Sequence, residues 1–376
     1  MEAYIVAGYR SAVGKAKKGG FKNYRTDDLA VDVIKHLTSQ VPELDTTKVD
    51  DVIVGCANPE GEQGLQVARL ISARALGKEV PGVTINRYCA SGLEAISMAV
   101  SKVRAGFGDI FIAGGIESMS LIPMTGYKLA PSYKANLENM NYHIGMGHTA
   151  EAVAEKYKIT RDASDKFSCE SHIKAANAID NGYFKDEIVP VTVEEVFVKD
   201  GKKVSKSHTV DMDEGVRRET TVEALSKLRP AFKLGGIVTA GSSSQMSDGA
   251  AFVLVMSEEM VKQLGVKPIA RMVTCTSGGV DPLYMGIGPV EAIPKALKQA
   301  GLKLSDIEQT ELNEAFAAQA LAVIQESGLD PDTVNVNGGA IALGHPLGCT
   351  GAKLSIQLLN EMKRRNQKYG MVTACV

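Results

Sequence analysis

Residues 86–92 read Asn86-Arg87-Tyr88-Cys89-Ala90-Ser91-Gly92, and they join a short β-branched run to an amphipathic helix. The run before them is Val83-Thr84-Ile85, and the apolar positions after them recur at helical spacing until Gly106. A cysteine at such a turn lies near unpaired backbone N–H groups and the positive end of the helix dipole, so we expect the turn to favour the thiolate. Free cysteines more often simply pack in a core, so the rest of the chain has to decide between these interpretations.

The turn lies within a series of apolar strands that alternate with amphipathic helices. We predict strands at residues 3–8, 51–55, 110–113 and 250–255, the third closed by Gly114-Gly115, and helices at 27–37 and 66–76. This alternation is typical of a parallel or mixed sheet with helices on both faces, so the predicted fold class is α/β.

Residues 118–247 depart from this pattern. They hold several methionines, many turn residues and a charged section at 194–218, yet apolar faces predict helices at 150–157 and 162–181. Helices with apolar faces need a core to pack against, so we interpret this part as an inserted domain. A lid or binding loop over a neighbouring site is the natural use of such an insertion.

The C-terminal part repeats the plan of the N-terminal part. An Asp–Asn pair at positions 51 and 58 recurs at 306 and 313 with the same spacing. Cys89 follows the first pair, and His345 follows the second at nearly the same distance. Each opens a helix that runs to a glycine and a strand, at 110–113 and 371–375. The repeat predicts two related halves, with Cys89 and His345 at equivalent turns.

Length, composition and charge limit the classes of protein to which this chain can belong. The chain has 376 residues, 44% of them apolar and 23% charged, which predicts two or three globular domains. A formal net charge of −2 gives no basic field for nucleic acid. We find no apolar window long enough to span a membrane and no signal peptide. The six cysteines are dispersed, which indicates reduced thiols in the cytoplasm.

Three further segments carry candidate chemistry. His345 lies in the glycine-rich run Asn337 to Gly351, where a tight backbone lets an imidazole take a proton from a thiol or donate to an oxyanion. Asn313 follows a predicted strand at 309–312 and opens a helix, either as a simple N-cap or as an amide that holds a water or carbonyl. Cys375, by itself, reads as a buried thiol. No Cys/His pair has zinc-ligand spacing and no P-loop occurs, so we expect no metal site and no P-loop nucleotide site.

Together these segments resemble the thiolase family over residues 3 to 376. The matching motifs are Asn86-Arg87-Tyr88-Cys89-Ala90-Ser91-Gly92, Asn313-Glu314-Ala315-Phe316-Ala317, Gly338-Gly339-Ala340-Ile341-Ala342-Leu343-Gly344-His345-Pro346 and the terminal Cys375. The resemblance implies a duplicated α/β fold in five layers, αβαβα, with an inserted loop domain. The expected domains are 1–117 with 248–265, the coenzyme A (CoA)-binding insertion 118–247, and 266–376.

The resemblance also implies roles. Cys89 would be the acyl-accepting nucleophile, His345 the base that generates its thiolate, Cys375 the second acid/base, and Asn313 the holder of an oxyanion-hole water. The implied substrate- and CoA-binding residues are Met146, Arg217, Phe232, Ser244, Met285, Ala315 and Phe316. CoA thioesters are the expected substrates, with no permanently bound cofactor and with a homodimer or homotetramer as the assembly.

The implied activity is thiolytic cleavage of 3-oxoacyl-CoA, or the reverse condensation, by ping-pong acyl transfer. Gly145 stands where short-chain biosynthetic thiolases tend to have histidine before Met146-Gly147, which favours the degradative 3-ketoacyl-CoA type. The alternatives are a short-chain acetyl-CoA acetyltransferase, a condensing enzyme of the ketoacyl-synthase kind, and a non-catalytic acyl-CoA binding protein.

One departure concerns the end of the sequence. In the family, a glycine-rich run and a final strand follow the cysteine that Cys375 matches, whereas this sequence ends at Val376. We expect the C-terminal half to lack its last segment and the oxyanion hole beside the Cys89 amide to lack one donor. Loss of one such donor costs about 2.7–4 kcal/mol of transition-state stabilisation, which predicts low activity for this chain.

Overall fold

The computed structural model describes residues 1–376 and is built around a mixed seven-stranded sheet. Its strands are β1 (Ala3–Ser11), β2 (Gly14–Lys15), β3 (Asp51–Cys56), β4 (Gly82–Ile85), β5 (Ile110–Ser118), β6 (Ile188–Val189) and β9 (Ser247–Ser257). The order is β4-β3-β5-β9-β1-β6, with β2 beside β9. Strands β3, β4 and β5 are parallel, and β9 runs antiparallel between β5 and β1.

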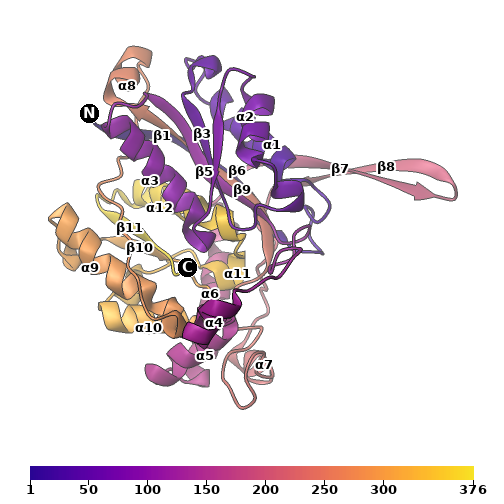
Figure 1. Ribbon diagram of the computed structural model, residues 1–376, viewed down its shortest axis with the longest axis vertical. Helices are drawn as coiled ribbons and strands as arrows, with labels where there is room; N and C mark the ends of the chain where they lie inside the picture. Colours follow the sequence, from indigo (N-terminus) through magenta and orange to yellow (C-terminus); the bar gives the residue numbers. More distant parts are fainter.

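Two pairs of helices cover this sheet (Figure 1). They are α1 (Thr26–Ser39) and α2 (Val67–Ala75) on one face, and α3 (Ser91–Arg104) and α12 (Leu347–Arg365) on the other. Side chains alternate along β3, so that Val52 and Val54 face α1 and α2 whereas Ile53 faces α3. Because both faces are covered, β3, β5 and β9 are buried along almost their whole length.

A second, smaller sheet lies on the far side of α12. It consists of β10 (Gln309–Leu312) paired in parallel with β11 (Gly370–Thr373). Helices α9 (Gly288–Ala300) and α10 (Ala317–Ser327) pack on its outer face. The layers therefore read αβαβα, as predicted, with α3 and α12 in the middle layer. A cavity of about 710 Å³ separates β11 from residues 267–276.

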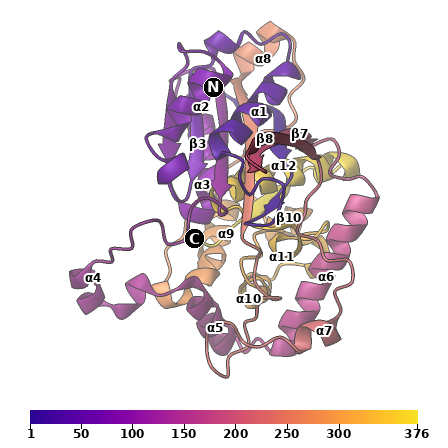
Figure 2. The same cartoon turned by 90° about the vertical axis from the view of Figure 1, so that its right-hand side faces the viewer.

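Residues 119–246 connect β5 to β9 and include two segments that project from the body. The hairpin of β7 (Val191–Lys199) and β8 (Lys202–Val210) extends away from the body, as Figure 1 shows. Figure 2 shows α4 (Tyr133–Glu138) projecting on another side. The other helices outside the central layers are α5 (Met146–Lys156), α6 (Arg161–Asp180), α7 (Val222–Ser226), α8 (Glu258–Leu264) and α11 (Ala340–Leu343). None of the helices is long and apolar enough to cross a bilayer.

Two element predictions are wrong in detail. The strand predicted to close at Gly114-Gly115 continues to Ser118. Glycine allows close packing of β5 against α12, because a Cβ on Gly115 would lie 1.9 Å from the backbone oxygen of Gly348 at the start of α12. Asn313 does not cap a helix either, because α10 begins only at Ala317. The Asn313 amide is thus free for another contact.

Candidate active site

Cys89 lies in a sharp turn between the edge strand β4 and helix α3. The turn is a single 3-10 turn, η3 (Tyr88–Ala90), and Tyr88 has a left-handed φ of 40°. Side chains hold this strained backbone: Tyr88 N donates to Asn86 Oδ1 (2.8 Å), and Ser91 Oγ accepts from Arg87 N (2.8 Å). The motif therefore fixes Cys89, whose side chain packs in a small cluster and is 4% exposed.

His345 lies between α11 and α12. Its backbone N–H lies 3.1 Å from both the carbonyl oxygen of Gln245 and Ser247 Oγ. The preceding Gly344 has φ 101°, and a Cβ there would lie 2.3 Å from Ser247 Oγ, so only glycine fits. This backbone places His345 Nε2 3.1 Å from Cys89 Sγ. The structure thus joins the two turns that the repeat places at equivalent positions.

Asn313 and Cys375 reach the same place from the second sheet. They follow the neighbouring strands β10 and β11, and Asn313 N donates to Thr373 O at 2.9 Å. Asn313 Nδ2 lies 3.3 Å from His345 Nε2, while its Oδ1 is buried without a partner. Cys375 is 2% exposed and close enough to Cys89 for a charge on one sulfur to affect the other. All four predicted residues therefore meet.

Burial controls the ionisation of these groups. It raises the pKa of the Cys89 thiol, and the nearby Cys375 raises that pKa further, whereas a backbone N–H lowers it. The prediction that the turn favours a thiolate is therefore wrong for the resting protein. Burial and the charge of Lys353 lower the pKa of His345 to about 3, and burial raises the pKa of Cys375 to about 12. Near neutral pH the site holds two thiols and a neutral imidazole.

The predicted substrate contacts fall into two groups. Ser244, Ala315, Phe316 and Phe232 are neighbours: Ser244 N donates to Ala315 O (2.9 Å), and the Phe232 and Phe316 rings meet edge to face at 5.9 Å. Met146 begins α5 beside this group, because the next residue, a glycine, packs against the Phe232 ring.

The other two residues are Arg217, in the inserted segment, and Met285, in the C-terminal half. Met285 is half-buried in η5 (Pro282–Ile287), which packs against α5. Arg217 is exposed on a loop whose backbone N–H donates to His172 Nδ1 at 3.1 Å, and its guanidinium has no ion-pair partner.

Residues 3–259 match the family described as "Thiolase, N-terminal domain", and residues 266–376 match "Thiolase, C-terminal domain". The chain belongs to the thiolase family. It is 52% identical over 378 residues to a 3-ketoacyl-CoA thiolase of Bacillus subtilis, covering 100% of this chain and 96% of the relative. A 3-ketoacyl-CoA thiolase of Marinobacter nauticus is 44% identical, with 100% and 95% coverage. The crystal structure of the Bacillus anthracis acetyl-CoA acetyltransferase matches with a TM-score of 0.89 at 38% identity, covering 100% and 95% of the two chains.

A buried carboxylate that the sequence analysis missed supports the site of this thiolase from behind. Glu117, at the end of β5, accepts hydrogen bonds from Ala57 N and Gly348 N (both 2.9 Å) and from Gln63 Nε2 (2.8 Å). It thereby links the end of β3 to the start of α12, just after His345. A lone acidic residue at the end of an all-apolar strand could have indicated this role.

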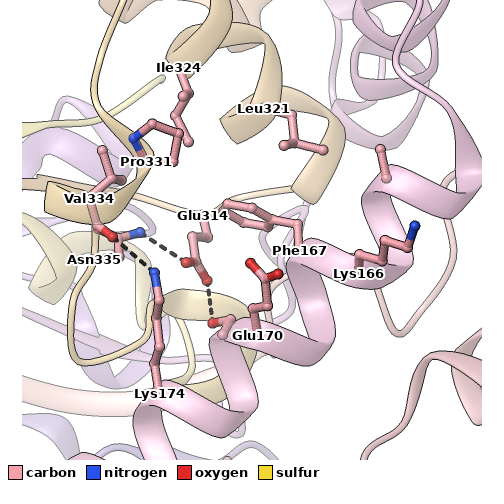
Figure 3. A pocket seen from close by; sticks show the side chains of 12 residues that line it. Lys166, Phe167, Glu170, Lys174, Glu314, Leu321, Ile324, Pro331, Val334 and Asn335 are labelled. Carbon is pink, nitrogen blue, oxygen red and sulfur yellow. Dashed lines mark hydrogen bonds between the residues drawn. The ribbon is translucent and has the colours of Figure 1, made fainter.

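Glu314 supports the other side of the thiolase site, at the floor of a cavity of about 210 Å³ between α6 and α10 (Figure 3). Its carboxylate accepts from Ser171 Oγ (2.7 Å), Asn335 Nδ2 (2.9 Å) and Ile341 N (3.2 Å). These bonds connect the inserted segment to the glycine-rich loop before His345. Because Glu314 faces α6, away from the thiols, we assign it a structural role next to Asn313. No group of three or more His, Cys, Asp or Glu side chains is arranged to hold a metal ion.

Proposed function

We propose that this thiolase cleaves 3-oxoacyl-CoA with CoA to give acetyl-CoA and a shortened acyl-CoA, and catalyses the reverse condensation. The observation that supports this most directly is the 3.1 Å contact between His345 Nε2 and Cys89 Sγ, with the Cys375 thiol beside them. A nucleophile, a base within hydrogen-bond reach and a second thiol are the groups that a reversible thioester exchange needs.

In the first half-reaction, Cys89 Sγ attacks the 3-oxo carbonyl carbon while its proton passes to His345 Nε2. The bond between C2 and C3 then breaks, which leaves an acyl group on Cys89 and the enolate of acetyl-CoA. The Cys375 thiol protonates the enolate carbon and becomes a thiolate. The high pKa of Cys375 suits this step, because the thiol keeps its proton until a strongly basic carbanion is present.

In the second half-reaction, an incoming CoA thiol gives its proton to the Cys375 thiolate and attacks the acyl group. Cys89 leaves and recovers its proton from His345, so the cycle closes with no net change in the protein. The protonated Nε2 of His345 and a water held by the free Asn313 amide would stabilise the enolate oxygen.

CoA thioesters are the proposed ligands, with no permanently bound cofactor. Arg217 would meet the nucleotide end and Ser244 the pantetheine amide. The apolar wall of Phe232, Phe316, Ala315, Met146 and Met285 would enclose the pantetheine and acyl chain. We assign these contacts to the inserted segment 118–247 together with the C-terminal half 266–376, with 1–117 and 248–265 forming the N-terminal half.

The relatives' names support a degradative 3-ketoacyl-CoA substrate, and Gly145 before Met146 agrees with it. The matching Bacillus anthracis structure is named an acetyl-CoA acetyltransferase, so acetoacetyl-CoA is the second candidate substrate. Cytoplasm is the proposed location, since all six cysteines are free and two thiols have to stay reduced. A homodimer or homotetramer is the proposed assembly.

Thiolysis rates with 3-oxoacyl-CoA substrates of increasing chain length test the proposal. We expect turnover that rises beyond the four-carbon substrate and is abolished in Cys89→Ala. Activity confined to the four-carbon substrate would establish the second candidate. Cys375→Ala should lose nearly all turnover, and retained condensation in that variant would instead indicate a ketoacyl-synthase type of reaction. CoA ester binding without turnover in the intact chain would reject both enzymatic proposals.

A further inference from the structure

The imidazole of His345 has a second hydrogen-bond partner that the proposed cycle does not use. Its Nδ1 lies 2.6 Å from Oγ1 of Thr350, in the first turn of α12. The two residues are 4% and 1% exposed, so water does not compete for the contact. This bond therefore sets both the orientation of the ring and the position of its proton.

The single hydroxyl proton of Thr350 is directed to another acceptor. Thr350 Oγ1 lies 2.9 Å from the carbonyl oxygen of Pro346, four residues earlier, which is a common partner of threonine in a helix. When that proton is on the Pro346 side, Oγ1 can only accept from the imidazole. Nδ1 then has to carry the proton of the ring.

The contacts on the opposite side of the ring agree with this assignment. Nε2 faces Cys89 Sγ at 3.1 Å and Asn313 Nδ2 at 3.3 Å, and a thiol and an amide nitrogen are both donors. The ring is neutral near pH 7, because burial and Lys353 lower the pKa of His345 to about 3. It has one proton to place. With that proton on Nδ1, the Thr350 hydroxyl oxygen accepts it and the Cys89 thiol can donate to Nε2.

We propose that Thr350 is a positioning residue that holds His345 as the Nδ1–H tautomer, with a bare Nε2 directed at Cys89. The opposite tautomer would present an N–H to the thiol and could not take its proton. The inference rests on the proposed function, since it explains how His345 becomes a base, yet it can be measured without turnover.

Thr350→Val removes the hydroxyl at nearly constant volume, and Thr350→Ser is the matched control that keeps it. The readout is the rate at which iodoacetamide alkylates Cys89 at neutral pH, followed by mass analysis of the peptide that carries it. We expect the valine variant to react about 10- to 100-fold more slowly, and the serine variant to stay within about threefold of the parent chain. Thermal unfolding of each variant, measured alongside, separates loss of reactivity from loss of fold.

A second measurement observes the tautomer itself in the parent chain, so it does not depend on whether a variant folds. In ¹⁵N-histidine-labelled protein, nitrogen shifts distinguish Nδ1–H from Nε2–H, and the His345 signal is the one of the 6 histidines that disappears in His345→Asn. An Nε2–H tautomer in the parent chain, or unchanged alkylation in a folded Thr350→Val, would overturn the inference. Alkylation that depends on His345 and Thr350 in a chain without thiolysis would reject the proposed function and leave the inference standing.

Discussion

The thiol of Cys89 and the imidazole of His345 are both shielded from water, and shielding moves their pKa values in opposite directions. It raises the pKa of the thiol and lowers that of the imidazole to about 3, so neither group is charged at rest. The proton can move from sulfur to nitrogen only as a substrate carbonyl approaches and developing charge is stabilised. A resting thiol is less exposed to oxidation and stray alkylation than a standing thiolate, because the thiolate is the reactive form.

His345→Asn removes the base and keeps a polar side chain in the buried site. We predict that acylation of Cys89 by acetyl-CoA slows about 10²- to 10⁴-fold, the usual contribution of general base catalysis. Binding of CoA should stay close to that of the parent chain, because His345 faces the thiol and not the proposed nucleotide contacts. Rapid-quench measurement of acyl-enzyme formation and calorimetric titration with CoA check the two expectations separately.

Glu117→Gln keeps the shape of a side chain that accepts from three donors at once. Oε2 accepts from both Ala57 N and Gly348 N, and the amide oxygen can take its place. The new amide nitrogen then stands at the position of Oε1, where it faces the donor Nε2 of Gln63, and neither donor has an acceptor there. We predict a loss of about 1–3 kcal/mol in the free energy of unfolding, from a buried group left unsatisfied. Urea unfolding measures it, with Glu326→Gln on the exposed side of α10 as the neutral control. Equal losses in the two variants would contradict the role given to Glu117.

At the scale of elements, the site depends on how closely α12 approaches the first sheet. Gly115 in β5 meets the backbone oxygen of Gly348, and a Cβ would lie only 1.9 Å from it. On the other side, Gly92 in α3 faces the backbone of Ala352 in α12, where a Cβ would lie 2.7 Å from the amide nitrogen. Small residues thus let the middle helices approach each other and the sheet, which brings the start of α3 next to the start of α12.

We therefore expect Gly115→Ala to lower the free energy of unfolding by about 1–3 kcal/mol or more. The added Cβ would clash with backbone atoms, which cannot move to another rotamer as a side chain can. Gly288→Ala is the control: it begins α9 with an open Cβ position and should be neutral or slightly stabilising. Differential scanning calorimetry compares the two. A Gly115→Ala variant that unfolds at the parent temperature would show that α12 can shift without cost.

His172 on α6 gives a pH dependence at the same scale. Burial, with the charges of Arg217 and Lys15, lowers its pKa to about 4, and its Nδ1 accepts from the Arg217 N–H. In the unfolded chain the group titrates near 6.5, so below that pH the unfolded chain binds more protons and stability falls as pH drops toward about 4. We predict a loss of up to about 3 kcal/mol over this window, and a smaller loss in His172→Gln. Parallel slopes for the two chains in urea unfolding between these pH values would contradict the assignment.

For the whole molecule, local pattern predicted the alternating strands and helices, whereas the resemblance to the thiolase family implied the five layers and the roles proposed for Asn313 and Cys375. The duplicated spacing placed Cys89 and His345 at equivalent turns, and the structure joins them at 3.1 Å. Long-range packing was not accessible in this way. The hydrogen bonds of Glu117 join residues far apart in sequence. Strand β5 continues through two glycines because α12 packs closely against it there, and the position of α12 is a property of the folded chain. The ionisation of Cys89 was predicted wrongly because burial, a property of the folded chain, outweighs the local helix start.

The central claim is that Cys89 carries the acyl group, and mass analysis after brief mixing with acetyl-CoA tests it directly. We predict an acetyl adduct on the peptide that contains Cys89, removed on addition of free CoA and absent in Cys89→Ser. The peptides that contain the buried Cys56 and Cys349 should remain unmodified and serve as internal controls. A folded sample with no adduct at Cys89, or with the adduct on Cys375 instead, would contradict the account.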